Sequence, residues 1–258
     1  MVKMAHLVSI VTPMFNAEKH IEQTIASVQS QTYQNWELLI ADDGSSDGSV
    51  DLVRDFAASD DRIKLIPTTQ NTGPAGARNR SIAQAQGRYL SFLDSDDFWR
   101  ADKLQVQLDF MANSSAQITY SNYQQVDESG ENIGGPIEVP ERVTYQTLLN
   151  SNAIPCLTAL YDTKMLGKQM MESVGHEDYV YWLSLLKSGC SAQGLNEVLA
   201  FYRVRQGSVS NNKLKAAGFQ WNIYRNIEEL SLIRSLYHFS IYTYQGLKKH
   251  RTLGSQLS

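Results

Sequence analysis

The sequence predicts an α/β fold built on a mostly parallel, doubly wound sheet, and two observations carry this prediction. Within residues 7–93, four short apolar runs rich in β-branched residues alternate with three segments whose apolar residues recur at helical spacing. Polar or glycine-containing turns separate these segments. Such alternation is typical of right-handed βαβ units, which place helices on both faces of one sheet.

The first expected strand covers residues 7–11 and is predicted to end at Thr12-Pro13. Asn16 is expected to cap the next helix, in which Ile21, Ile25 and Val28 recur at i, i+4 and i+7. The other elements expected in this half are strands at 36–41, 63–66 and 89–93, a helix carrying Val50, Val53 and Phe56, and a helix over 75–85.

The chain after residue 97 has a less regular pattern, which predicts an α+β half followed by C-terminal helices. Without a repeat or a clear linker, we expect one body over 1–210, with halves at 1–100 and 101–210, and a tail over 211–258. The expected elements are helices at 101–111, 179–186 and 212–250, and strands at 117–123, 157–161 and 198–204.

Composition limits the class of protein. The chain has 258 residues, 42% of them hydrophobic, which is enough for a sizeable core. A formal net charge of −4 argues against nucleic acid as a partner. Cys156 and Cys190 lie far apart without CxxC spacing, which fits a reducing compartment and no zinc site. We expect a cytoplasmic protein, since the sequence has neither a signal-peptide pattern nor an apolar run near the ~18 residues of a membrane span.

The charge is unevenly distributed. The tail at 211–258 has seven Lys or Arg and two Glu, a net charge of +5, so residues 1–210 carry −9. The tail is also rich in aromatic residues. Two interpretations stay open: helices packed on the body, or an interfacial helix on an anionic membrane surface.

The densest acidic cluster is Asp94-Ser95-Asp96-Asp97, directly after the fourth expected strand. Three carboxylates in four residues repel one another unless a cation is near. Mg²⁺ and Mn²⁺ take oxygen ligands and often bridge carboxylates to a substrate diphosphate. The alternative is a helix cap. Because ligands of parallel α/β sheets bind beyond the carboxyl ends of the strands, the position favours a metal site.

The turns over 12–16 and 42–48 also follow strands directly and are expected at the same sheet edge. Asp42 and Asp43 belong to a turn that either caps the next helix or accepts hydrogen bonds from a uracil N–H or a ribose hydroxyl. Arg78 lies near a helix start, where its guanidinium suits a phosphate or a base carbonyl.

The second half offers two more candidates. Glu177 and Asp178 open an expected helix, either as acids favoured by the helix dipole or as a general base directed into a cleft. Arg203 and Arg205 flank a strand end, as a solvated edge or as part of a loop over a diphosphate.

Missing motifs weaken the competing enzyme classes. There is no GxxxxGK[ST], which excludes a P-loop NTPase, and no GxGxxG after the first strand, which makes a dehydrogenase the weakest candidate. A sugar-nucleotide pyrophosphorylase usually has a glycine-rich, basic loop after that strand, whereas residues 12–16 contain no basic residue. A non-catalytic nucleotide-sugar-binding protein stays open; it has no need of Asp178.

Taken together, five segments resemble the inverting family 2 glycosyltransferases with the GT-A fold, over residues 6 to about 210. In order, they are VSIVTPMFNAEKHIEQTIASVQSQTYQNWELLIADDGSSDGS, NTGPAGARN, YLSFLDSDDFW, HEDYVYWLSLL and YRVRQGSVS. The resemblance implies a catalytic domain over 1–210 with a nucleotide-sugar-binding half and an acceptor half. It also implies Mn²⁺ or Mg²⁺, a UDP-sugar donor and inversion at the anomeric carbon.

The resemblance further implies a role for each motif. For the nucleotide, it implies that Thr12, Pro13 and Phe15 border the base, that Asp42 and Asp43 bind uracil or ribose, and that Arg78 lies nearby. For the metal, it implies a DxD motif of Asp94, Ser95 and Asp96, in which Asp94 and above all Asp96 bind the ion, with Asp97 as a substitute. For the reaction, it implies that Asp178 is the base with Glu177 beside it, and that Arg203 and Arg205 cover the diphosphate.

Bacterial O-antigen and capsule enzymes are the members that this sequence resembles. The resemblance therefore implies transfer of a hexose, from UDP-glucose or UDP-galactose, to a lipid-diphosphate-linked saccharide. It also implies a peripheral protein at the cytoplasmic face of the inner membrane, with a homo-oligomer as a further possibility.

Overall fold

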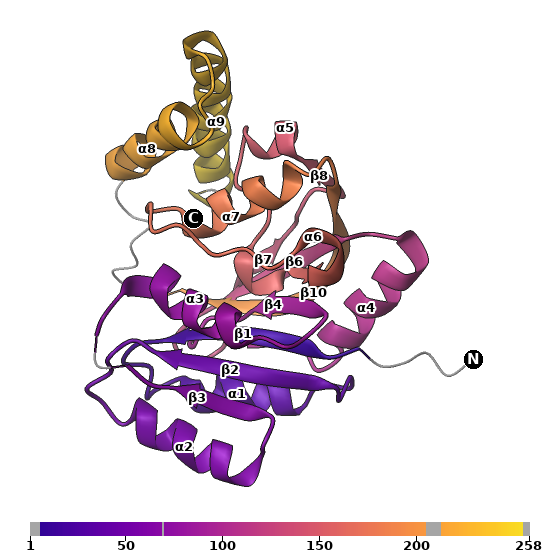
Figure 1. Ribbon diagram of the computed structural model, residues 1–258. Coiled ribbons are helices and arrows are strands. Elements are labelled where there is room, and N and C mark those ends of the chain that lie inside the picture. Colours follow the sequence, from indigo (N-terminus) through magenta and orange to yellow (C-terminus); the bar gives the residue numbers. More distant parts are fainter. Residues whose placement is uncertain (1–5, 69, 205–212, 255–258) are drawn as a thin grey trace.

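A computed structural model describes residues 6–68, 70–204 and 213–254, and within these residues a ten-stranded mixed sheet organises the fold. The strand order is β3-β2-β1-β4-β9-β6-β10-β5, with β7 beside β6 and β8 beside β10 (Figure 1). The strands are β1 Val8–Met14, β2 Trp36–Asp42, β3 Ile63–Ile66, β4 Tyr89–Phe92, β5 Phe98–Trp99, β6 Ile118–Val126, β7 Asn132–Ile137, β8 Arg142–Thr144, β9 Leu160–Asp162 and β10 Ser191–Arg203.

The first half is the expected parallel, doubly wound unit. Strands β3, β2, β1 and β4 are parallel neighbours, and α1 and α2 cover one face while α3 covers the other (Figure 1). Alternate residues of each strand supply two separate cores, as a two-residue period requires. The helices here are α1 Ile21–Gln29, α2 Ser49–Ser59 and α3 Gly73–Gln84. The predicted fold class is therefore confirmed.

Two local predictions in this half are wrong. Strand β1 continues through Pro13 to Met14. The backbone of Val11 faces β4, so the nitrogen of Pro13, two residues later, faces the same side. Because the pairing of β1 with β4 ends at Val11, no hydrogen bond from residue 13 is needed there. Asn16 does not cap α1, which begins at Ile21 after His20. Its side chain instead accepts a hydrogen bond from the backbone N–H of Ser46, which ties the turn after β1 to the turn after β2.

The second half extends the same sheet, with β9 antiparallel between β4 and β6. The strand expected at 157–161 is shorter, because a 3₁₀ turn, η1 Cys156–Thr158, precedes β9 and is closed by a hydrogen bond from Thr158 N–H to Pro155 O. The strand expected at 198–204 begins earlier, at Ser191. The helices here are α4 Lys103–Ser114, α5 Tyr145–Leu148, α6 Thr163–Leu166 and α7 Glu177–Leu186.

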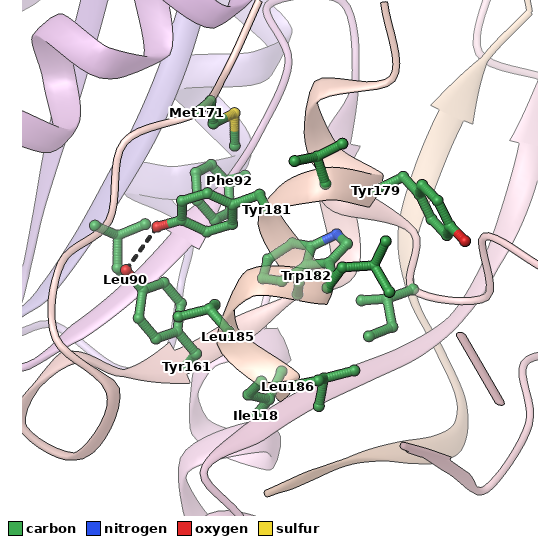
Figure 2. Close-up of a cluster of buried hydrophobic side chains, with 14 of the residues drawn as sticks. Leu90, Phe92, Ile118, Tyr161, Met171, Tyr179, Tyr181, Trp182, Leu185 and Leu186 are labelled. Carbon is green, nitrogen blue, oxygen red and sulfur yellow. Dashed lines mark hydrogen bonds between the residues drawn. The ribbon is translucent and has the colours of Figure 1, made fainter. Parts of the chain in front are cut away.

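Helix α7 is anchored by large buried side chains. Tyr179, Tyr181 and Trp182 are at most 1% exposed. Tyr181 and Trp182 pack edge-on against Phe92 of β4, and the hydroxyls of Tyr181 and of Tyr161 on β9 share a hydrogen bond of 2.7 Å (Figure 2). Tyr179 lies on another side of the helix and donates to Leu148 O at 3.1 Å. Burying an aromatic side chain of this size contributes roughly 1.5–3 kcal/mol. The first turn of α7, which carries Glu177 and Asp178, is therefore held against the sheet.

The C-terminal segment forms α8 Lys213–Asn222, a π-helical turn η3 Ile223–Ile227, and α9 Leu232–Gly254. Figure 1 shows α8 and α9 together at the end of the molecule away from α2. This segment packs on the body: Tyr224 is fully buried and donates to Leu149 O, and Glu228 pairs with Lys187 at 3.0 Å. Within the described residues, the helices lack the combination of length and apolar character that spanning a bilayer requires.

Candidate active site

A pocket of about 290 Å³ opens where β1, β2 and β4 end. Its walls come from the turns after these strands and from the start of α3, as expected for a parallel sheet. The lining residues are Pro13, Met14, Phe15, Asp43, Asn71, Gly73, Pro74, Ala77, Arg78, Asp94, Ser95 and Asp96. Seven of the residues proposed from the sequence therefore meet at one place.

The apolar side of the pocket is formed by the end of β1. Phe15 is 51% exposed, so its ring is available to a planar ligand, and Pro13 lies beside it in the lining. Thr12 is not part of the lining. It is fully buried, and its hydroxyl has no hydrogen-bond partner among the described residues.

The two aspartates after β2 have different surroundings. Asp42 is buried and its carboxylate accepts from the backbone N–H groups of Gly44 and Ser45, at 3.2 Å each, so it stabilises the turn and is not part of the pocket lining. Asp43 lines the pocket. The predicted contact of Asp42 with the nucleotide does not fit this geometry.

Asp43 also holds the start of α3. Its carboxylate accepts from the backbone N–H groups of Thr72 at 2.9 Å and Gly73 at 2.8 Å, and from Arg80 at 3.0 Å. Burial alone would raise the pKa of Asp43, but these hydrogen bonds lower it below its usual value. The carboxylate is thus charged and fixes one rim of the pocket.

Arg78 lies at the centre of the charged residues. It is 8% exposed, and Nη2 donates to Oδ1 of Asp94 over 2.5 Å. Burial alone would lower the pKa of Arg78; the nearby Asp94, Cys156 and Asp178 raise it above its usual value. Asp94 of the acidic turn contacts this guanidinium directly, and the charge of Asp178 on α7 acts on it as well.

The acidic turn after β4 divides its carboxylates between two sides. Asp94, Ser95 and Asp96 line the pocket, whereas Asp97 is 1% exposed and accepts from the backbone N–H of Arg203 at 2.8 Å. Burial, and then the charges of Asp96 and Asp94, raise the pKa of Asp97 well above its usual value. Asp97 is not in the lining, so its place does not fit the expected role as a substitute metal ligand.

Arg203 supports this turn from behind. It is 2% exposed, and its guanidinium donates to the backbone oxygens of Asp96, Asp127 and Glu128 and to the side chain of Gln23. These contacts correct the prediction that Arg203 covers a diphosphate: its donors are used to hold the acidic turn. Arg205 lies outside the described residues.

The candidate base lies outside the pocket lining, as does its neighbour Glu177. Asp178 is half-buried in the first turn of α7, and its Oδ2 accepts from Nδ2 of Asn152 at 3.2 Å. Glu177, also half-buried, is the first residue of the helix. Asn152 lies in an irregular segment with no periodic or motif signal, so the sequence alone does not point to it.

The donor set suits a hard divalent cation. The described residues contain no group of three or more His, Cys, Asp or Glu placed to hold a metal by themselves. Asp94 and Asp96 nevertheless line one pocket, and Mg²⁺-type ions are commonly held by one or two carboxylates together with substrate phosphate oxygens and water. The residues present therefore fit such an ion.

Comparison with known proteins agrees with this geometry. The family model described as glycosyl transferase family 2 matches residues 9–174. The chain belongs to this family. The family assignment made from the sequence is therefore confirmed. The match includes every residue of the pocket lining and ends before Asp178, so it does not include the candidate base.

Two bacterial relatives match this glycosyltransferase over nearly its whole length. TuaG of Bacillus subtilis, which is named for teichuronic acid biosynthesis, is 41% identical over 94% of this chain and 97% of its own. WfgD of Escherichia coli is 41% identical over 95% of both chains and is named as a UDP-Glc:alpha-D-GlcNAc-diphosphoundecaprenol beta-1,3-glucosyltransferase. The solved structure of TarS 1–349 from S. aureus in complex with UDP-GlcNAc has the same fold, with a TM-score of 0.69 at 18% identity over 92% of this chain and 71% of that one.

Proposed function

We propose that this family 2 glycosyltransferase transfers glucose from UDP-glucose to a hydroxyl of a lipid-diphosphate-linked saccharide in bacterial surface polysaccharide synthesis. The observation that carries the proposal is the meeting of Arg78, Asp94 and Asp96 in one pocket, while Asp178 opens α7 and its charge acts on the same guanidinium. The choice of UDP-glucose over UDP-galactose, and of the acceptor, follows the activity for which the relative WfgD is named.

Asp178 is the proposed general base. It accepts the proton of the acceptor hydroxyl, whose oxygen forms a bond to the anomeric carbon while the bond from that carbon to the diphosphate oxygen breaks. UDP leaves with the electron pair. A single displacement inverts the anomeric carbon, so an α-linked donor gives a β-linked product.

The pocket residues bind and orient the donor. Pro13 and Phe15 offer an apolar surface to the base, and Asp43 keeps the rim in place for the uridine. Arg78 faces the growing negative charge of the leaving group. Asp94 and Asp96 would hold Mn²⁺ or Mg²⁺, which when bound supplies positive charge to the diphosphate.

The body over 1–210, as two halves, is the proposed catalytic domain, and the tail over 211–258 is proposed to bring it to the membrane. A lipid-linked acceptor suits a peripheral protein at the cytoplasmic face of the inner membrane.

The test measures UDP release by the purified chain with a panel of UDP-sugars, with and without a synthetic GlcNAc-diphosphate-lipid acceptor, in Mn²⁺, Mg²⁺ or chelator. We expect release with UDP-glucose only when both acceptor and metal are present. Asp178→Asn should reduce it by about 10²–10⁴-fold, the usual contribution of a general base.

Matched controls separate the roles. Glu177→Gln changes the neighbouring acid and should stay within a few fold of wild type, and Asp109→Ala, an exposed acid on α4, is the control for Asp96→Ala. UDP binding by calorimetry without turnover of any donor would instead support a non-catalytic nucleotide-sugar-binding protein. Equal losses in Glu177→Gln and Asp178→Asn would remove the assignment of the base.

A further inference from the structure

Large apolar side chains gather in an exposed position on α9. Among the described residues, Ile233 is 80% exposed, Leu236 54%, Tyr237 60% and Tyr244 68%. Their spacing of i, i+3, i+4 and i+11 places them on one side of the helix. These four residues are called the α9 face below.

The opposite side of α9 is already in contact with the body. Ser235 and His238 are at most 5% exposed, and Nδ1 of His238 shares a hydrogen bond of 2.8 Å with Oδ1 of Asn150. The body therefore holds the helix without using the α9 face.

The charge of this helix indicates the kind of surface that covers the α9 face. Residues 232–254 contain Arg234, Lys248, Lys249 and Arg251 and no acidic residue, whereas residues 1–210 carry a net charge of −9. An apolar face on a basic helix is favoured at an anionic bilayer surface, by burial and by attraction to the lipid head groups. Pairing with a second α9 would instead bring two basic helices together.

The same C-terminal unit lies against the segment that leads into the candidate base. The ring of Phe219 on α8 packs edge-on against His176, with 5.8 Å between ring centroids, and lies directly over Gly175. A surface that held α9 would thus be coupled through α8 to the start of α7.

We propose that α9 lies on an anionic membrane surface with Ile233, Leu236, Tyr237 and Tyr244 inserted among the lipids. Membrane binding by α9 would present the pocket to a lipid-linked acceptor, and in this respect alone the proposal rests on the proposed function.

Vesicle flotation of the full chain, without donor or acceptor, tests the proposal. The vesicles are phosphatidylcholine alone or phosphatidylcholine with phosphatidylglycerol, at low and high salt. Ile233→Ser with Leu236→Ser removes apolar area that is exposed and so leaves folding intact. The matched control is Met165→Ser with Met170→Ser, since these side chains are exposed to a similar extent, 58% and 53%, away from α9.

We expect wild type and the methionine control to bind the anionic vesicles and to be released by salt, and the Ile233/Leu236 variant to bind at least about tenfold more weakly. Equal binding by the two double variants, or binding by none of the proteins, would overturn the proposal. A wild-type dimer in ultracentrifugation that is lost in the Ile233/Leu236 variant, without vesicle binding, would assign the α9 face to a second copy instead. Because no turnover is measured, failure of the proposed transferase activity would leave these results unchanged.

Discussion

Arg78 on α3 and Asp94 after β4 form an ion pair within the pocket, with 2.5 Å between Nη2 and Oδ1. The acidic turn therefore has a built-in cation, which offsets the repulsion among its carboxylates. A divalent ion that bound to Asp94 and Asp96 would add to this positive charge or take over part of its role.

Arg78→Ala should therefore make stability depend on metal. The substitution leaves Asp94 without its mostly buried partner, so the free energy of unfolding should fall by roughly 1–3 kcal/mol. Added Mn²⁺ should restore part of this stability. Thermal unfolding with and without Mn²⁺ measures both effects. Arg54→Ala is the control, because the Arg54–Asp51 pair is exposed and contributes little. Equal stabilisation of wild type and Arg78→Ala by Mn²⁺ would contradict this account.

Asp43→Asn should loosen the start of α3 and weaken UDP binding by about tenfold, since charge-assisted hydrogen bonds to Thr72, Gly73 and Arg80 become neutral ones. The pKa of Asp43 is lowered on folding, so its stabilisation is present above the unfolded-state pKa and is lost as pH falls through the lower folded-state pKa.

Denaturant unfolding at several pH values checks this sign. The stability gap between wild type and Asp43→Asn should be full at neutral pH and should narrow below about pH 4. Asp51→Asn, whose side chain is 83% exposed, serves as the control. A gap that widened towards acid pH would show that the charge of Asp43 does not stabilise the fold.

The pocket was predictable because it belongs to the regular half of the chain. Apolar runs fix the parallel strands, and their carboxyl ends must share an edge, so Phe15, Asp43 and Asp96 converge without further information, whereas the place of Arg78 was expected from the family resemblance. The sequence does not separate the roles of the adjacent Asp42 and Asp43, because only the folded turn shows that the carboxylate of Asp42 accepts hydrogen bonds from backbone N–H groups.

The second half was harder to predict because its contacts join distant, irregular segments. An arginine at a strand end can bind either a diphosphate or several backbone carbonyl oxygens. For Arg203 the fold determines the partner, because it brings the backbone oxygens of Asp127 and Glu128 to the guanidinium. The 26-residue separation of Asn152 and Asp178 likewise leaves no periodic signal.

Lys103 gives a prediction about stability alone. It is fully buried on α4, donates to Gln107 at 2.7 Å, lies 3.9 Å from the ring centroid of Trp99, and has a pKa well below its usual value because of burial. A lowered lysine pKa means that folding carries a penalty at neutral pH, which disappears as pH rises through the folded-state pKa towards the unfolded-state pKa.

Wild type should therefore gain stability relative to Lys103→Met between neutral pH and about pH 10. The melting temperatures of the two proteins across this range provide the measurement. Lys19→Met, at an exposed position, controls for the loss of one charge. Parallel pH curves for wild type and Lys103→Met would show that this amine is not desolvated.

Asn152 is predicted to position the base through the hydrogen bond that its amide donates to Oδ2 of Asp178. Without this donor the carboxylate is no longer fixed in one orientation, so Asn152→Leu should lower kcat. Donor KM should change little, because Asn152 is not in the pocket lining. Asn152→Gln keeps an amide and should recover part of the rate. An equal loss of kcat in Asn152→Leu and Asn152→Gln would contradict this role, because the effect would then not depend on the amide donor.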